Sequence, residues 1–166
     1  LREAWGVVHQ AKIKNKGKNV KLVGYSRYLD PQNIYIGDNV RIGYGCFLFG
    51  KGKIFIDDNT ILSRYVTIYS SNHNYKSNVV PYDNSYISKP VRIGKSVWIG
   101  MHVKITPGVT IGDGAIIGMG VTLTKNVEPG AIVFCADNTV VSHRDMDVFL
   151  ENQRENRIFG LLFPDL

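Results

Sequence analysis

A six-residue repeat of large aliphatic side chains runs through most of this sequence. Isoleucine or leucine recurs in three runs, at Ile36, Ile42 and Leu48, at Ile56, Leu62 and Ile68, and at Ile93, Ile99, Ile105, Ile111, Ile117 and Leu123. A spacing of six does not keep to one face of an α-helix, which turns once in about 3.6 residues. The repeat therefore predicts short β-strands that wind into a solenoid, an all-β fold whose coils bury an aliphatic column.

Three such units make one triangular coil, with Gly, Asp and Asn residues at its corners. This period predicts that Ile99 stacks against Ile117 and Ile105 against Leu123, on coils about 4.8 Å apart. The repeat is interrupted by two extra residues before Ile56 and by about twenty before Ile93. The longer interruption predicts a loop insertion at about 74–90.

The pattern predicts a single repeat domain over 20–140, preceded by an N-terminal segment or cap at 1–19. The tail at 141–166 carries Val148, Phe149 and Leu150 among charged residues, which indicates a helix. We expect that helix to cover the open end of the solenoid, because terminal coils need capping.

The composition excludes several classes of protein. Among 166 residues, 44% are hydrophobic and 20% are charged, as in one ordinary soluble domain, and no apolar run reaches the roughly 20 residues of a membrane span. Cys46 and Cys135 are too few for a disulfide framework, which favours a cytoplasmic location. The net charge of +6 favours an anionic partner, but no nucleic-acid-binding motif is present.

A more specific pattern surrounds the second interruption. Asn72-His73 is followed by the loop, by Pro90-Val91-Arg92-Ile93-Gly94-Lys95-Ser96-Val97-Trp98-Ile99-Gly100, and by the remaining units to Lys125. This order resembles the hexapeptide-repeat acyltransferases, and within them the sugar O-acetyltransferases that modify galactosides, maltose, nodulation factors and bacterial surface polysaccharides. The resemblance covers about 20–140 and implies a left-handed parallel β-helix of hexapeptide repeats. It also implies a homotrimer with active sites at subunit interfaces, acetyl-CoA as the co-substrate, and no metal.

The candidate catalytic residues are His73 and Asn72. Asn72 is a large polar residue at a place of the repeat that is otherwise almost always small, just where the coil is interrupted, and such exceptions are expected at functional sites. An imidazole titrates near neutral pH and can take the proton of an attacking hydroxyl. The resemblance implies that His73 is this base, while Asn72 or a backbone amide could donate to the developing oxyanion. Alternatively, both residues cap a strand and bind the loop.

The resemblance also implies contacts with coenzyme A. Backbone at Met101 and Met119, equivalent corners of successive coils, would follow the pantetheine arm, and Trp98 would lie near the thioester. Thr124 and Lys125 would lie nearer the nucleotide, where a lysine can screen phosphate charge. The candidate coenzyme residues are Trp98, Met101, Gly118, Met119, Thr124, Lys125 and Arg144.

The loop insertion supplies the candidates for acceptor binding. Aromatic rings and polar groups together suit a sugar, which has apolar C–H faces and hydroxyl groups. The candidates are Tyr75, Tyr82, Asp83 and Tyr86, which are also ordinary loop residues.

The resulting expectation is an acetyl-CoA-dependent transfer of acetyl to a sugar hydroxyl, in the biosynthesis of a surface polysaccharide such as capsule or O-antigen. The alternatives are an acetyltransferase for an antibiotic or amino sugar, and a non-catalytic trimeric scaffold. A third alternative is a γ-type carbonic anhydrase, which needs three imidazoles around zinc. The chain lacks the pair of histidines five residues apart that resembles that site.

Overall fold

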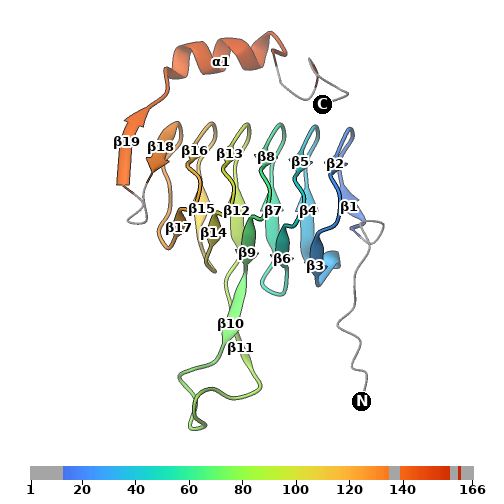
Figure 1. The fold of residues 1–166 in the computed structure, drawn as a ribbon, viewed down its shortest axis with the longest axis vertical. Helices are drawn as coiled ribbons and strands as arrows, with labels where there is room; N and C mark the ends of the chain where they lie inside the picture. Colours follow the sequence, from blue (N-terminus) through green and yellow to red (C-terminus); the bar gives the residue numbers. More distant parts are fainter. Residues whose placement is uncertain (1–12, 135–138, 158–160, 162–166) are drawn as a thin grey trace.

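The strands wind into a parallel β-solenoid of five complete three-strand coils and the beginning of a sixth (Figure 1). The structure is a computed structural model and describes residues 13–134, 139–157 and 161. The predicted fold class, a β-helix of hexapeptide repeats with a loop insertion and a C-terminal helix, is confirmed. No helix among the described residues is long and apolar enough to cross a membrane.

The successive coils are β1 (Asn15–Lys16), β2 (Lys21–Leu22) and β3 (Arg27–Leu29); β4 (Ile34–Ile36), β5 (Arg41–Ile42) and β6 (Phe47–Phe49); β7 (Ile54–Ile56), β8 (Ile61–Leu62) and β9 (Thr67–Tyr69); β12 (Val91–Ile93), β13 (Trp98–Ile99) and β14 (Lys104–Ile105); and β15 (Thr110–Ile111), β16 (Ile116–Ile117) and β17 (Thr122–Leu123). A short 3-10 helix, η2 (Pro31–Asn33), joins the first two coils. β18 (Ala131–Phe134) begins the sixth coil, and β19 (Thr139–His143) pairs with it. The first strand thus lies within the segment 1–19, before the expected start of the repeat domain.

Three sheets form the sides of the prism. Sheet A has the order β1-β4-β7-β12-β15, sheet B β19-β18-β16-β13-β8-β5-β2, and sheet C β17-β14-β9-β6-β3. We name the corners by the sheets they join along the chain: AB, BC and CA.

The register of the coils agrees with the repeat. Ile99 pairs with Ile117, and Ile105 pairs with Leu123, as predicted. All twelve aliphatic residues of the repeat are buried, with exposed fractions from 0% to 5%. Burial of each such side chain stabilises the fold by roughly 2 kcal/mol.

Coil length changes along the solenoid. Ile36 pairs with Ile56, and Ile93 pairs with Ile111, so the early coils have two residues more than the later ones. The two extra residues lie at the CA corner, where the turn after β6 reads Gly50-Lys51-Gly52-Lys53.

Asparagines line the AB corner of the first three coils. Asn19, Asn39 and Asn59 have φ of 51°, 56° and 60°, in the left-handed region that asparagine tolerates better than most residues. Their amides form a ladder, in which Asn19 Nδ2 donates to Asn39 Oδ1 and Asn39 Nδ2 donates to Asn59 Oδ1, both at 3.0 Å.

The C-terminal helix α1 (Met146–Arg154) lies along the side of the coils, and the expectation that it covers the open end is wrong (Figure 1). Asp145 caps the helix by accepting from the backbone N–H groups of Asp147 and Val148. The buried Phe149 ring lies where a Cβ on Gly114 would stand, and Gln153 Nε2 donates to Ser96 Oγ at 2.8 Å. At that end of sheet B, β18 pairs instead with β19, which becomes the edge strand of the sheet.

Candidate active site

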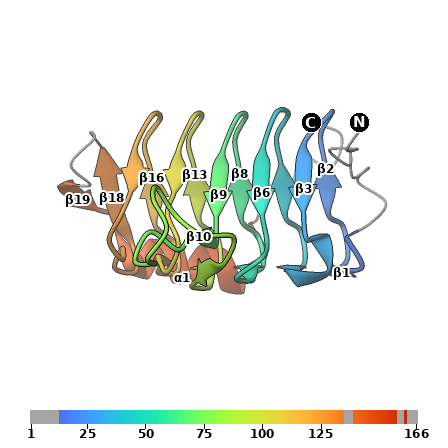
Figure 2. The same cartoon turned by 90° about the horizontal axis from the view of Figure 1, so that it is seen from below.

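The loop insertion is a β-hairpin that leaves the CA corner between the third and fourth coils. β10 (Ser71–His73) and β11 (Tyr86–Ser88) are antiparallel, and the hairpin extends away from the coils on the side opposite to α1 (Figures 1 and 2). At its base, the hydroxyls of Ser71 and Ser88 lie 2.9 Å apart, and the Lys89 N–H donates to the Ser70 carbonyl at 2.9 Å. These bonds close the coil across the insertion.

His73 lies at the end of β10, opposite Tyr86 of β11. Its imidazole stacks on the ring of Tyr82, with centroids 4.0 Å apart and an angle of 15° between the planes, and contacts Tyr86 at 4.7 Å. Tyr86 contacts Phe49 of sheet C at 6.1 Å, so ring contacts connect the hairpin to the solenoid. Two tyrosine rings therefore hold the imidazole in place.

One nitrogen of the His73 imidazole, Nδ1, lies on the buried side of the ring. Nδ1 is buried and has no hydrogen-bond partner within the described part of the chain, and it is one of two such side-chain atoms there. An imidazole is oriented by the partner of its second nitrogen. None of the described residues orients the His73 imidazole by a hydrogen bond to Nδ1. The rings of Tyr82 and Tyr86 contact the imidazole instead.

Asn72 and His73 are consecutive in β10, so their side chains point to opposite faces of the hairpin. Asn72 is exposed, and its backbone pairs with Ile87. The structure therefore does not bring the Asn72 amide to the side of the imidazole.

The other loop residues are ordered by local hydrogen bonds. Asp83 Oδ1 accepts from the hydroxyl and the backbone N–H of Ser85, and Asp83 Oδ2 accepts from Asn74 Nδ2 at 3.3 Å. The bonds from Ser85 lower the pKa of Asp83, which is ionised at neutral pH. Tyr75 is 65% exposed. Of the predicted acceptor residues, Tyr82 and Tyr86 pack on His73, Asp83 orders the loop, and Tyr75 presents its ring to solvent.

Five of the seven predicted coenzyme residues fall on two corners. Met101 and Met119 occupy the BC corner of successive coils, where the Gly120 N–H donates to the Met101 carbonyl at 2.8 Å. Met119 is 70% exposed, and Gly118 lies beneath the ring of Phe134. Thr124 and Lys125 follow β17 at the CA corner, on the other side of sheet C. One chain therefore does not gather all of these residues in one groove.

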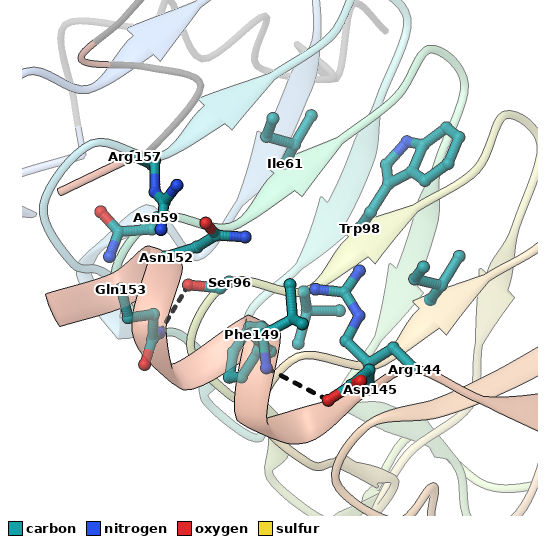
Figure 3. A pocket seen from close by; sticks show the side chains of 13 residues that line it. Asn59, Ile61, Ser96, Trp98, Arg144, Asp145, Phe149, Asn152, Gln153 and Arg157 are labelled. Atoms are coloured by element: carbon teal, nitrogen blue, oxygen red, sulfur yellow. Dashed lines mark hydrogen bonds between the residues drawn. The ribbon is translucent and has the colours of Figure 1, made fainter. Parts of the chain in front are cut away.

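A groove of about 480 Å³ lies between α1 and the outer face of sheet B (Figure 3). Trp98 and Arg144, two of the predicted coenzyme residues, both line it, together with the apolar side chains of Ile61 and Ile116. Trp98 is 51% exposed, and its Nε1 donates to Ser63 Oγ at 3.3 Å.

The two arginines of this groove have different partners. The guanidinium of Arg144 lies 5.2 Å from the Phe149 ring, and burial lowers the pKa of Arg144. Arg157 forms ion pairs with Glu151 and Glu155. The other polar side chains of the lining are those of Asn59, Ser96, Asp145, Asn152 and Gln153. No pattern in the sequence predicts that they meet, because this depends on where α1 packs.

Within residues 13–134, 139–157 and 161, no group of three or more His, Cys, Asp or Glu side chains could hold a metal ion.

Comparison with known proteins gives a consistent set of relatives. The family model for bacterial transferase hexapeptide (six repeats) matches residues 90–125. Nodulation protein L of Rhizobium meliloti (strain 1021) is 41% identical over 107 residues, which are 61% of this chain and 55% of that protein. This chain thus spans about half the length of that relative.

Solved structures extend the comparison to a larger share of the chain. A maltose O-acetyltransferase from Clostridium difficile 630 has a TM-score of 0.71 and 34% identity, over 78% of this chain and 68% of that chain. A galactoside acetyltransferase in complex with coenzyme A has a TM-score of 0.68 and 28% identity, over 80% and 66%. The chain is thus similar to the maltose and galactoside acetyltransferases, and it belongs to the hexapeptide-repeat acyltransferases.

Proposed function

We propose that this chain is an acetyl-CoA-dependent O-acetyltransferase that acts on a sugar hydroxyl, with His73 as the general base. The observation that carries the proposal is the position of His73, which is held within the hairpin by the rings of Tyr82 and Tyr86, where the repeat is interrupted. An imidazole in that position can remove the proton of a bound hydroxyl as the oxygen attacks.

The reaction is a direct transfer. The hydroxyl oxygen bonds to the thioester carbonyl carbon while His73 takes its proton, and a tetrahedral oxyanion forms. The C–S bond then breaks, and the thiolate of coenzyme A leaves and receives the proton from His73. Since the Asn72 side chain points to the other face of β10, a backbone amide is the better candidate for the donor to the oxyanion.

Coenzyme A is the proposed source of the acetyl group. The support is the galactoside acetyltransferase of similar fold, whose solved structure contains coenzyme A. In this chain the pantetheine arm would follow the BC corner at Met101, Gly118 and Met119. Trp98 and Arg144 would receive another part of the coenzyme in the groove beside α1, and Thr124 and Lys125 would contact its phosphates.

We propose further that the chain works as a homotrimer with active sites between subunits. The proposed coenzyme residues lie at two corners of the prism and in the groove beside α1, and β10, which ends at His73, extends away from the coils (Figure 1). A neighbouring copy that met the hairpin would gather these groups and could supply a partner for Nδ1 of His73, which has none among the described residues. Holding both substrates across such an interface would supply much of the rate acceleration.

The proposed setting is cytoplasmic synthesis of a surface polysaccharide, because acetylated sugars are parts of such polymers in the family that the sequence resembles. The proposed acceptors are sugars because the related structures are a maltose and a galactoside acetyltransferase.

Replacement of the base is the direct test. We expect His73→Ala to lower kcat by about 10³-fold while the KM for acetyl-CoA changes little, since a general base contributes about 10²–10⁴-fold. Thiol release and mass spectrometry of the acetylated sugar measure the rate. The matched control is His143→Ala, at an exposed histidine of β19, which should keep full activity. Full turnover by the His73→Ala protein would refute the assignment.

A further inference from the structure

Exposed lysines follow the CA corner from which the hairpin leaves. Lys51 and Lys53 lie in the turn between the second and third coils, Lys89 follows the hairpin, and Lys125 lies three coils beyond the first turn. In the part of the chain that the structure describes, none of these four forms an ion pair with a carboxylate. The hairpin divides the row, with Lys51 and Lys53 on its N-terminal side.

Lys51 is connected to the candidate base. Its ammonium lies 4.1 Å from the centre of the Tyr86 ring, and that ring lies 4.7 Å from His73. The turn itself packs directly on the base of the hairpin, because the Gly52 N–H donates to Ser70 Oγ at 2.9 Å. A Cβ on Gly52 would collide with the Ser70 carbonyl oxygen, so a glycine is required for this approach.

Lys53 occupies a backbone position that does not suit lysine. Its φ is 76°, in the left-handed region where glycine or asparagine would be less strained. Corner residues such as Tyr65 and His102 have a similar φ, so this backbone is common in the solenoid, and it is the exposure of Lys53 beside Lys51 that makes its charge available.

The coenzyme cannot readily account for Lys51 and Lys53. Coils lie about 4.8 Å apart, so the turn of Lys51 and that of Lys125 are about 14 Å apart along the prism, with the hairpin leaving between them. If Lys125 contacts the phosphates of coenzyme A, the lysines beyond the hairpin face a different anion. If His73 is the base, the molecule that meets it on that side would be the acceptor.

We propose that Lys51, assisted by Lys53, recognises a phosphate or diphosphate group attached to the acceptor sugar. This inference rests on the proposed function and narrows its substrate class to sugars in an activated, anionic form. Lys51 is a specificity residue in this scheme: it attracts the anionic end of the acceptor and so places the sugar hydroxyl against His73.

The test compares acceptors that share one sugar. Values of kcat/KM are measured for methyl α-D-galactoside, α-D-galactose 1-phosphate and UDP-galactose, and for the same three forms of glucose. We expect the two anionic forms to be preferred by about tenfold or more, since each tenfold corresponds to about 1.4 kcal/mol. The preference should fall when salt is raised to 0.5 M, because exposed charges are screened. The phosphate and the nucleotide forms separate a simple phosphate site from a nucleotide site.

Substitutions then assign the preference. Lys51→Gln should lower kcat/KM about tenfold for the anionic acceptors and less than twofold for the methyl glycoside, with an unchanged KM for acetyl-CoA. Lys51→Arg should keep the preference, and Lys18→Gln, an exposed lysine at the AB corner, should change nothing. An equal loss on neutral and anionic acceptors would overturn the inference, because Lys51 would then act on His73 through Tyr86.

A binding measurement separates this inference from the proposed function. If the wild-type protein acetylates none of the sugars, calorimetry with inorganic pyrophosphate still reports on the anion site. The site is supported if Lys51→Gln weakens the binding of pyrophosphate about tenfold and Lys125→Gln leaves it unchanged. Failure of pyrophosphate to bind, or binding that depends on Lys125 alone, refutes it.

Discussion

In the described part of the chain, the imidazole of His73 is held by aromatic contact, and its buried Nδ1 has no hydrogen-bond partner. We expect Tyr86→Ala to lower kcat about tenfold with little change in the KM for acetyl-CoA, because misplacement of a catalytic group by about 1 Å can cost as much. Tyr86→Phe keeps the ring and should restore most of the rate. If Phe were as poor as Ala, the hydroxyl rather than the ring would be the important group, and steady-state kinetics distinguishes the two.

A second residue-scale prediction concerns alkaline stability. Burial raises the pKa of Tyr28 from 10.0 to about 12 and that of Cys46 from 9.0 to about 11. The folded chain thus holds both protons to a higher pH than the unfolded chain does. Each group therefore makes its full contribution to the free energy of unfolding below about pH 9. That contribution should be lost as the pH rises to about 12, which lowers the free energy of unfolding by about 2–3 kcal/mol for each group.

Urea denaturation at pH 8 and pH 11 measures this loss. Cys46→Ala removes one of the two groups and should show a smaller loss between the two pH values, whatever its stability at pH 8. An identical loss in the variant would show that Cys46 does not take part.

At the scale of elements, the asparagine ladder predicts how the turns resist substitution. Asn39 has a left-handed backbone and hydrogen bonds to Asn19 and Asn59. Asn39→Ala should cost about 2 kcal/mol, from backbone strain of about 1 kcal/mol and lost bonds of about 1 kcal/mol. Glycine adopts the left-handed backbone without strain, so Asn39→Gly should lower the free energy of unfolding by clearly less than Asn39→Ala does. Thermal or urea unfolding gives both values, and equal costs would rule out a contribution from strain.

Most strands could be predicted from the repeat, because one aliphatic residue in six marks each of them. The first coil was harder to predict from the repeat, because the residue that pairs with Ile36 is Lys16, which is exposed and not aliphatic. The helix was predicted from the apolar tail, but its position depends on the contact of Phe149 with Gly114, which no local pattern contains.

The candidate site was predictable to a similar extent. Asn72 occupies a place of the repeat where other units have a small residue, and the repeat is interrupted directly after it. These two features predicted His73 as the candidate base. The packing of Tyr82 and Tyr86 on that imidazole was not predicted, because it depends on how the hairpin strands pair and how the loop folds back. The groove beside α1 was not predicted for the same reason as the helix position.

At the scale of the whole molecule, the division of the proposed site between corners predicts complementation. His73→Ala chains and Met119→Trp chains, which should block the pantetheine path, are expected to be inactive alone. Mixed trimers should regain activity at about a quarter of their sites, because some interfaces combine an intact base with an intact groove. Size-exclusion chromatography with light scattering should give three times the 18.6 kDa of one chain. Activity that never returns on mixing would mean that each chain carries a complete site.

The closed base of the hairpin has a consequence for how such enzymes diversify. Ile68 and Ile105 stack on adjacent coils although the insertion separates them in sequence, and bonds at Ser70, Ser71 and Ser88 join the ends of that insertion. The entropy of closing a loop grows slowly with its length, so residues 74–85 can be lengthened, shortened or replaced at little cost to the prism. The tip of the hairpin can therefore be exchanged for another loop while the prism keeps its fold.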